Sequence, residues 1–174
     1  MPLLKYILCF GLLVLCSMGY GQSMFYKVYS GLGYDVGEGV AELPDSSFVI
    51  TGSSTSWEGS TQVYLMKIDS AGTRQWTKHY GGPESDGATR LLFNEDLGLY
   101  AIGYTNSMGS GDYNGLVVKT DQNGNEEWQK SFGESTSWEF LHDAVFAKDS
   151  SIVMVGESTS LIDGDKDVYM LRID

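Results

Sequence analysis

The sequence predicts an all-β protein made of three repeated units, each a four-stranded antiparallel sheet of about 52 residues. Three observations lead to this prediction. Every landmark recurs after 51 to 53 residues, each unit holds four short runs of β-branched and aromatic residues, and no stretch has a convincing helical period. Self-similarity at such a period is typical of repeat architectures.

Three landmarks define the repeat. The first is an aromatic-x-Lys-x-aromatic segment followed by glycine, the second is an Asp-led turn that opens an apolar run ending in glycine, and the third is an apolar run ending in Asp. The matched segments are 25–29, 76–80 and 128–132 for the first, 45–52, 96–103 and 149–156 for the second, and 63–69, 115–121 and 168–174 for the third.

The links between units carry the strongest local signal. Asp69-Ser70-Ala71-Gly72 and Asp121-Gln122-Asn123-Gly124 each join two strand patterns. An Asp side chain accepts backbone N–H groups at the start of a turn, and glycine adopts the positive φ that closes a hairpin. Trp76 and Trp128 follow four residues after these glycines, where a large flat side chain can fill the space between adjacent sheets.

Four short strands in about 50 residues are typical of a β-propeller blade, so we interpret the units as propeller blades. The units span about 24–75, 76–127 and 128–174, and the strands of the second lie near 74–80, 87–93, 98–104 and 114–121. Three blades do not close a ring, since propellers have about four to eight. We therefore expect an incomplete propeller whose remaining blades or further domains are missing from this chain, and which associates or aggregates alone.

The N-terminal segment 1–21 has the pattern of a secretory signal peptide. Lys5 provides the positive charge, an apolar run follows, and Gly19 and Gly21 are small residues before the expected cleavage. The apolar run is shorter than the ~20 residues that span a membrane. An uncleaved anchor and lipidation at Cys16 are the alternatives. We expect a secreted or outer-surface protein with no transmembrane span.

Composition restricts the partners. Both cysteines, Cys9 and Cys16, lie in the signal segment, so the remaining chain relies on burial and strand pairing without disulfides. Loss of Lys5 with that segment lowers the formal net charge from −12 to −13. Such a surface repels phosphate backbones, so we expect no nucleic-acid partner.

The repeat resembles a known family. Aromatic-x-Lys-x-aromatic-Gly, then an acidic residue, then Gly-Tyr-Thr-Asn-Ser (103–107) and Lys-x-Asp-x-x-Gly-x-x-x-Trp (119–128) are similar to the seven-bladed β-propeller repeats of secreted bacterial proteins. The resemblance covers nearly all of 24–174. It implies an exported or surface protein, often with a C-terminal sorting domain for type IX secretion that this chain lacks, and it implies no catalytic residue. A weaker resemblance to quinoprotein-type repeats fails at the glycine spacing, so we expect no quinone cofactor.

Residues at matched positions are best explained by the blade, and this includes the carboxylates Asp35, Asp86 and Glu139. Among unmatched residues, Asp163, Asp165 and Asp167 alternate along the chain and are candidate calcium ligands, with a solvated turn as the alternative. Trp57 and Glu58 are candidate ligand-binding residues, because a loop tryptophan can stack on a sugar or cap a blade edge.

These features predict an exported, non-catalytic β-propeller segment that serves as a scaffold for protein or glycan interaction. We expect no cofactor other than calcium. Neither His79 nor His142 belongs to a metal spacing, and no nucleophile motif accompanies them. The alternatives are a glycan-active hydrolase or lyase with carboxylates in a propeller pocket, and a structural spacer of a larger adhesin.

Overall fold

The computed structural model describes residues 24–57, 59–109, 112–160 and 162–174. The expected signal segment 1–21 lies outside these residues. Eleven strands and no helix occur in the described part of the chain. The strands are β1 (Asp35–Glu42), β2 (Phe48–Ser54), β3 (Gln62–Ile68), β4 (Arg74–Tyr80), β5 (Asp86–Phe93), β6 (Leu99–Thr105), β7 (Asn114–Thr120), β8 (Glu126–Phe132), β9 (Ser137–Phe146), β10 (Ile152–Ser160) and β11 (Lys166–Ile173). A search of the same residues finds no helix with the length and apolar character needed to cross a membrane.

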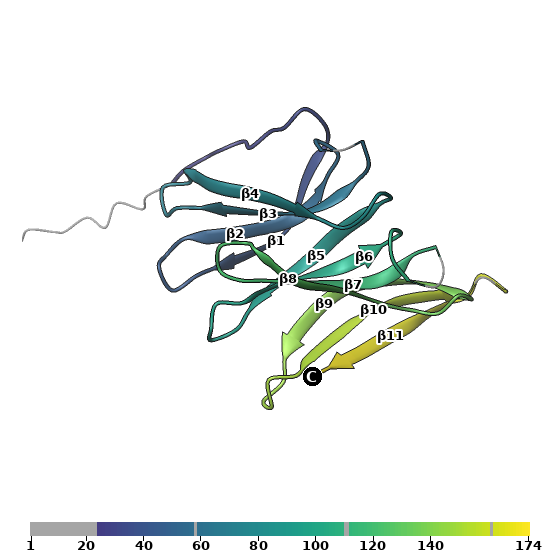
Figure 1. The fold of residues 1–174 in the computed structure, drawn as a ribbon. Coiled ribbons are helices and arrows are strands. Elements are labelled where there is room, and N and C mark those ends of the chain that lie inside the picture. Colours follow the sequence, from purple (N-terminus) through teal and green to yellow (C-terminus); the bar gives the residue numbers. More distant parts are fainter. Residues whose placement is uncertain (1–23, 58, 110–111, 161) are drawn as a thin grey trace, which may run out of the picture.

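The strands form three antiparallel sheets of consecutive strands, which confirms the all-β prediction. Sheet I has the order β1-β2-β3-β4, sheet II the order β5-β6-β7-β8, and sheet III the order β9-β10-β11. Sheets I and II have the expected four strands, whereas sheet III has three among the described residues. None of the sheets formed by the described residues closes on itself. Figure 1 shows the sheets following one another in chain order, from the purple and blue strands to the yellow ones.

The aromatic segments that open the second and third sequence units are the last strands of the preceding sheets. β4 pairs with β3, and β8 pairs with β7. The reason is the turn between the two paired strands. In the turn between β3 and β4, Asp69 Oδ1 accepts the N–H groups of Ala71 and Thr73 at 2.9 and 2.8 Å, and Gly72 adopts φ +75°. This tight hairpin returns the chain to the same sheet. The segment that opens the first unit, 25–29, lies in no strand.

Each sheet buries one face against the next. β5 packs against β1, β2 and β3, and β9 packs against β5, β6 and β7. The core between sheets I and II contains Val49, Leu65, Leu99 and Leu116. A second core, between sheets II and III, contains Ile102, Val117, Leu141 and Met154. Because successive residues of a strand point to opposite faces, the middle sheet contributes to both cores.

The repeated glycine of the second strand is required by close packing within each sheet. A Cβ at Gly52, Gly103 or Gly156 would lie 1.8, 2.1 or 1.9 Å from a carbonyl oxygen of the first strand of the same sheet. All three sheets have a pairing irregularity beside this point, between Gly37 and Gly39, between Ala88 and Arg90, and between Val155 and Gly156. Such an irregularity bends the strand and brings the two backbones close together.

Candidate functional site

The matched carboxylates each tie together the start of one sheet, and we call each such group a carboxylate clasp. Asp35 accepts the Gly31 N–H at 2.7 Å and the hydroxyls of Ser54 and Ser56. These contacts join the entrance of β1 to the end of β2 and the loop that follows it. They are the backbone and turn bonding that the matched positions predict.

Sheet II repeats the clasp in a more buried form. Asp86 accepts the Gly82 N–H and the Ser107 hydroxyl, both at 2.8 Å, and its side chain is fully buried. In sheet III, Glu139 accepts the hydroxyls of Ser137 and Ser158. Each carboxylate is therefore held in its own sheet through one oxygen or both, while the buried Asp86 Oδ1 and Glu139 Oε2 have no hydrogen-bond partner among the described residues.

In sheet I, the clasp also favours the charged form of Asp35. Burial raises the pKa of Asp35, but the hydrogen bonds from Ser54, Gly31 and Ser56 outweigh burial and hold that pKa below its ordinary value. A carboxylate stabilised in this way stays ionised, since the donors favour its charged form. It is poorly suited to act as a general acid at neutral pH.

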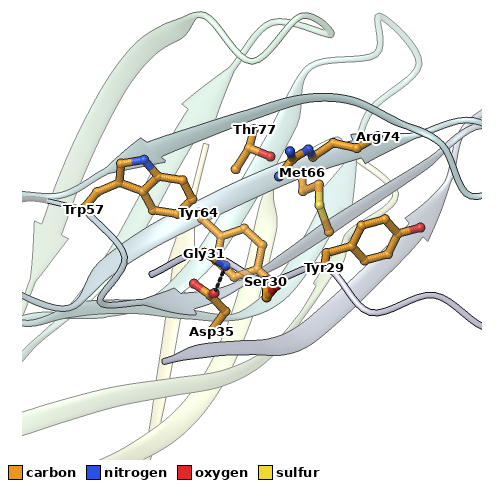
Figure 2. A pocket seen from close by; sticks show the side chains of 9 residues that line it. All are labelled: Tyr29, Ser30, Gly31, Asp35, Trp57, Tyr64, Met66, Arg74 and Thr77. Carbon is orange, nitrogen blue, oxygen red and sulfur yellow. Dashed lines mark hydrogen bonds between the residues drawn. The ribbon is translucent and has the colours of Figure 1, made fainter. Parts of the chain in front are cut away.

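A pocket beside the Asp35 clasp contains Trp57 (Figure 2). It lies between sheet I and the segment before β1, and encloses about 50 Å³. Aromatic, charged and small residues line it together: Tyr29, Ser30, Gly31, Asp35, Trp57, Tyr64, Met66, Arg74 and Thr77. We call this the Trp57 pocket.

Trp57 is half-buried, and its ring packs against the ring of His79. Its ring centroid lies 3.8 Å from that of His79, with an interplanar angle of 35°. The structure thus places this predicted residue at the wall of a pocket, where it is more enclosed than an exposed loop tryptophan. Glu58 lies outside the described residues.

The Trp57 pocket has opposite charges on different strands. The Asp35 carboxylate comes from β1 and the exposed Arg74 from β4, and Figure 2 shows the Arg74 guanidinium beside Met66, with Asp35 on the other side of the pocket. Tyr64 lies between them and is buried, and burial, followed by the nearby charges of Asp35 and Glu38, raises the pKa of its hydroxyl. The hydroxyl of Thr77 is buried and has no hydrogen-bond partner among the described residues.

A larger cavity occupies the equivalent place in sheet III. It encloses about 590 Å³ and is lined by Ser131, Phe132, Gly133, Glu134, Ser137, Glu139, Ser158, Tyr169 and Leu171. In the repeat, Phe132 corresponds to Tyr29, Tyr169 to Tyr64 and Leu171 to Met66. The difference is the wall that β4 contributes to the Trp57 pocket, for which sheet III has no equivalent among the described strands.

The three candidate calcium ligands lie on and beside an exposed turn. Asp163 and Asp165 belong to the turn before β11, and Asp167 lies on β11 itself. The Asp163 carboxylate accepts the Asp165 N–H at 3.3 Å, and Gly164 has φ +80°. Within the described residues, no three His, Cys, Asp or Glu side chains gather in a way that could hold a metal ion. The calcium site stays a prediction.

Comparison with protein-family models finds none that matches the chain, and comparison with curated proteins finds no match either. The resemblance to secreted propeller repeats therefore stays a prediction. The candidate site is defined by its geometry alone.

Proposed function

We propose that this chain is an exported, non-catalytic β-propeller segment that recognises a protein or glycan ligand, and that the Trp57 pocket contributes to recognition. The observation that carries the proposal is the combination in one pocket of aromatic rings, a carboxylate and a guanidinium. Aromatic faces stack on sugar rings or apolar side chains, and charged groups orient polar partners.

The small volume of the pocket favours recognition of one projecting group of a ligand over enclosure of a whole small molecule. Sites that enclose a small molecule measure about 300–1,000 Å³, whereas the Trp57 pocket holds about 50 Å³. It accommodates one projecting group of a ligand whose remainder lies on the surface. A single hydroxyl, acetyl or short side chain fits this description.

The clasp contacts weigh against the alternative of a glycan-active enzyme. Catalysis of glycoside hydrolysis needs two free carboxyl groups at a set separation on either side of a substrate. The repeated carboxylates are engaged by serine hydroxyls instead. The third alternative, a structural spacer, requires no ligand and is separated from recognition by a binding experiment.

The test is a glycan and peptide array probed with the purified chain, followed by titration of any hit by calorimetry. We expect Trp57→Ala and Arg74→Gln each to weaken binding at least tenfold, because they remove an aromatic wall and the positive charge. Trp138→Ala is the matched control, since Trp138 is a half-buried tryptophan outside the pocket. Equal loss in all three variants, or no loss in the first two, would contradict the proposal.

A further inference from the structure

Sheet III ends in an unpaired strand and an uncovered apolar face. Among the described residues, β11 pairs only with β10, so none of them bonds to the backbone groups on its other edge. On the face turned away from sheet II, Val145, Val155, Val168 and Met170 are 60%, 41%, 87% and 69% exposed. We call this the outer face of sheet III. Exposed apolar faces next to a free strand edge are typical of sites that take up another strand.

The equivalent face of sheet I is an interface. The repeat aligns Val63 and Leu65 of β3 with Val168 and Met170 of β11. Both β3 residues have no exposed surface, because sheet II covers them. The outer face of sheet III thus carries the side chains of a sheet-to-sheet contact without the partner sheet.

The segment 25–29 carries the sequence pattern of a fourth strand but pairs with no strand in the part of the chain that the structure describes. It repeats the aromatic-x-Lys-x-aromatic pattern of β4 and β8. Tyr29 donates its hydroxyl to the Gly72 carbonyl at 2.7 Å, as Tyr80 of β4 donates to the Gly124 carbonyl at 2.7 Å. Figure 1 shows the purple segment running along the side of sheet I that faces away from sheet II.

This geometry means that Phe25–Tyr29 lies on sheet I as β4 lies on sheet II. β4 also pairs with β3 in sheet I, whereas residues 25–29 pair with no strand among the described residues. One end of the molecule therefore presents a strand that lacks a sheet. The other end presents a sheet that lacks this strand.

A comparison of the two cavities also indicates that sheet III lacks a fourth strand among the described residues. Arg74 and Thr77 of β4 form part of the wall of the Trp57 pocket, which encloses about 50 Å³. The corresponding cavity of sheet III measures about 590 Å³, and no fourth strand lies beside β11 among the described residues to line it. By the repeat, Tyr26 takes the position of Thr77 and would cover this opening.

We propose that Phe25–Tyr29 of a second copy of this chain adds to the free edge of β11 as the fourth strand of sheet III. The register follows from the repeat. Val63 lies opposite Tyr80 in sheet I and Gly115 opposite Phe132 in sheet II, which places Tyr29 of the second copy opposite Val168. Lys27 then lies opposite Met170, and Phe25 opposite Arg172.

Strand addition in this register brings two apolar faces together. Because Phe25–Tyr29 already packs on sheet I, its pairing with β11 places the outer face of sheet III against the outer side of sheet I of the second copy. That side includes the exposed Val40, whose equivalent Leu91 is buried between sheets I and II. The contact is head-to-tail, so it grows into a chain unless it closes. Two copies contain six sheets, a number within the usual range for a closed propeller ring.

Mass measurement and a register-specific cross-link test the proposal. The chain purified after export is examined by light scattering, and we expect at least two copies per particle. Met170→Lys should reduce the mass to one copy, because it places a positive charge in the contact opposite Lys27 of the second copy. Ile162→Lys is the control, since Ile162 is 84% exposed in the turn outside this face. Circular dichroism checks that each variant keeps its strands.

The cross-link uses the absence of cysteine after residue 16. Chains carrying Lys27→Cys are mixed with chains carrying Met170→Cys and oxidised, and we expect a disulfide-linked pair as the main product. Replacing Met170→Cys by Arg172→Cys moves the thiol two residues out of register and should lower the yield at least fivefold. A single copy per particle, or equal yields from both pairings, would overturn the proposal. Association without any cross-link would overturn it equally, because another segment would then occupy the edge.

Discussion

The two ends of the molecule have the same repeated sheet but differ in what covers it. On the outer side of sheet I, Tyr64, Met66 and Ile68 are buried, with Tyr29 packed against them. On the outer face of sheet III, Val168 and Met170 are exposed. The outer sides of the two end sheets thus differ because a single short segment, 24–31, covers one of them. The difference shows that an end sheet of this repeat buries its outer side only where another segment of chain lies on it.

The largest expected effect comes from truncating equivalent residues at the two ends. Leu65→Ala in β3 should lower the free energy of unfolding by about 2–5 kcal/mol, because it leaves a cavity between sheets I and II. Met170→Ala in β11 should lower it by less than about 0.5 kcal/mol in a dilute monomeric sample, because Met170 is exposed. Urea unfolding followed by circular dichroism measures both. Similar losses at the two positions would break the comparison.

A smaller effect separates the two tyrosines that bond to equivalent turns. Tyr80→Phe should cost about 1–2 kcal/mol, since the Tyr80 hydroxyl is buried and the Gly124 carbonyl loses its partner. Tyr29→Phe should cost less than about 1 kcal/mol, because water reaches the half-buried Gly72 contact. The same urea assay measures both substitutions. A larger loss for Tyr29→Phe would mean that segment 24–31 supports the fold more than β4 does.

The acid titration should be alike at both ends. The Ser47 hydroxyl, then the Ser47 N–H and Lys67, lower the pKa of Asp45 from 3.8 to about 2. At the matching turn of sheet III, the Ser151 hydroxyl, then the Ser151 N–H, lower the pKa of Asp149. Since the folded pKa lies below the unfolded one, the stabilisation is present above about pH 4 and is lost as the pH falls toward 2.

Carbon-detected NMR of the side-chain carboxyls measures these two pKa values directly. We expect both midpoints below 3.8, with Asp45 near 2. Ser47→Ala and Ser151→Ala are the matched variants, and each should raise the pKa of its own aspartate only. An ordinary midpoint for Asp149 beside a lowered one for Asp45 would show that the turn differs between the ends.

The smallest effect concerns calcium at the turn before β11. We expect little or no saturable heat when calcium is added to the chain, because Asp163 bonds within its own turn and the described residues form no metal-ligand group. Asp165→Ala should give the same trace. A saturable heat that disappears in Asp165→Ala would instead establish the calcium site that the alternating carboxylates predict.

The sequence predicts best the bounds of strands that pair with the next strand along the chain. The expected strands at 74–80, 87–93, 98–104 and 114–121 agree with β4 to β7 within one residue at each end. The repeat assigns residues 76–80 to the second unit, whereas β4 belongs to sheet I. A repeat period identifies equivalent segments, but it does not show which turn is a tight hairpin that returns the chain to the same sheet. The Asp69 turn was recognised, yet its consequence, that β4 returns to β3, requires the hairpin geometry.

The candidate site was only partly predictable. Trp57 stood out as an unmatched aromatic residue in a loop, and it does line a pocket. Arg74 and Thr77 also line this pocket, but they lie at variable positions of a repeated strand and gave no signal. The serines of the clasps were visible as a Ser/Thr-rich loop, whereas their pairing with Asp35, Asp86 and Glu139 depends on the three-dimensional bend of each sheet.

Amide hydrogen exchange of β11 tests most directly the claim that the free edge of sheet III is completed by a second copy. The peptide covering Lys166–Ile173 is followed by mass spectrometry across a range of protein concentrations, with the peptide covering β7 as the internal reference. We predict that protection of β11 rises with concentration, because strand addition occupies its free N–H groups, while β7 stays protected throughout. Fast exchange of β11 at every concentration would contradict the account.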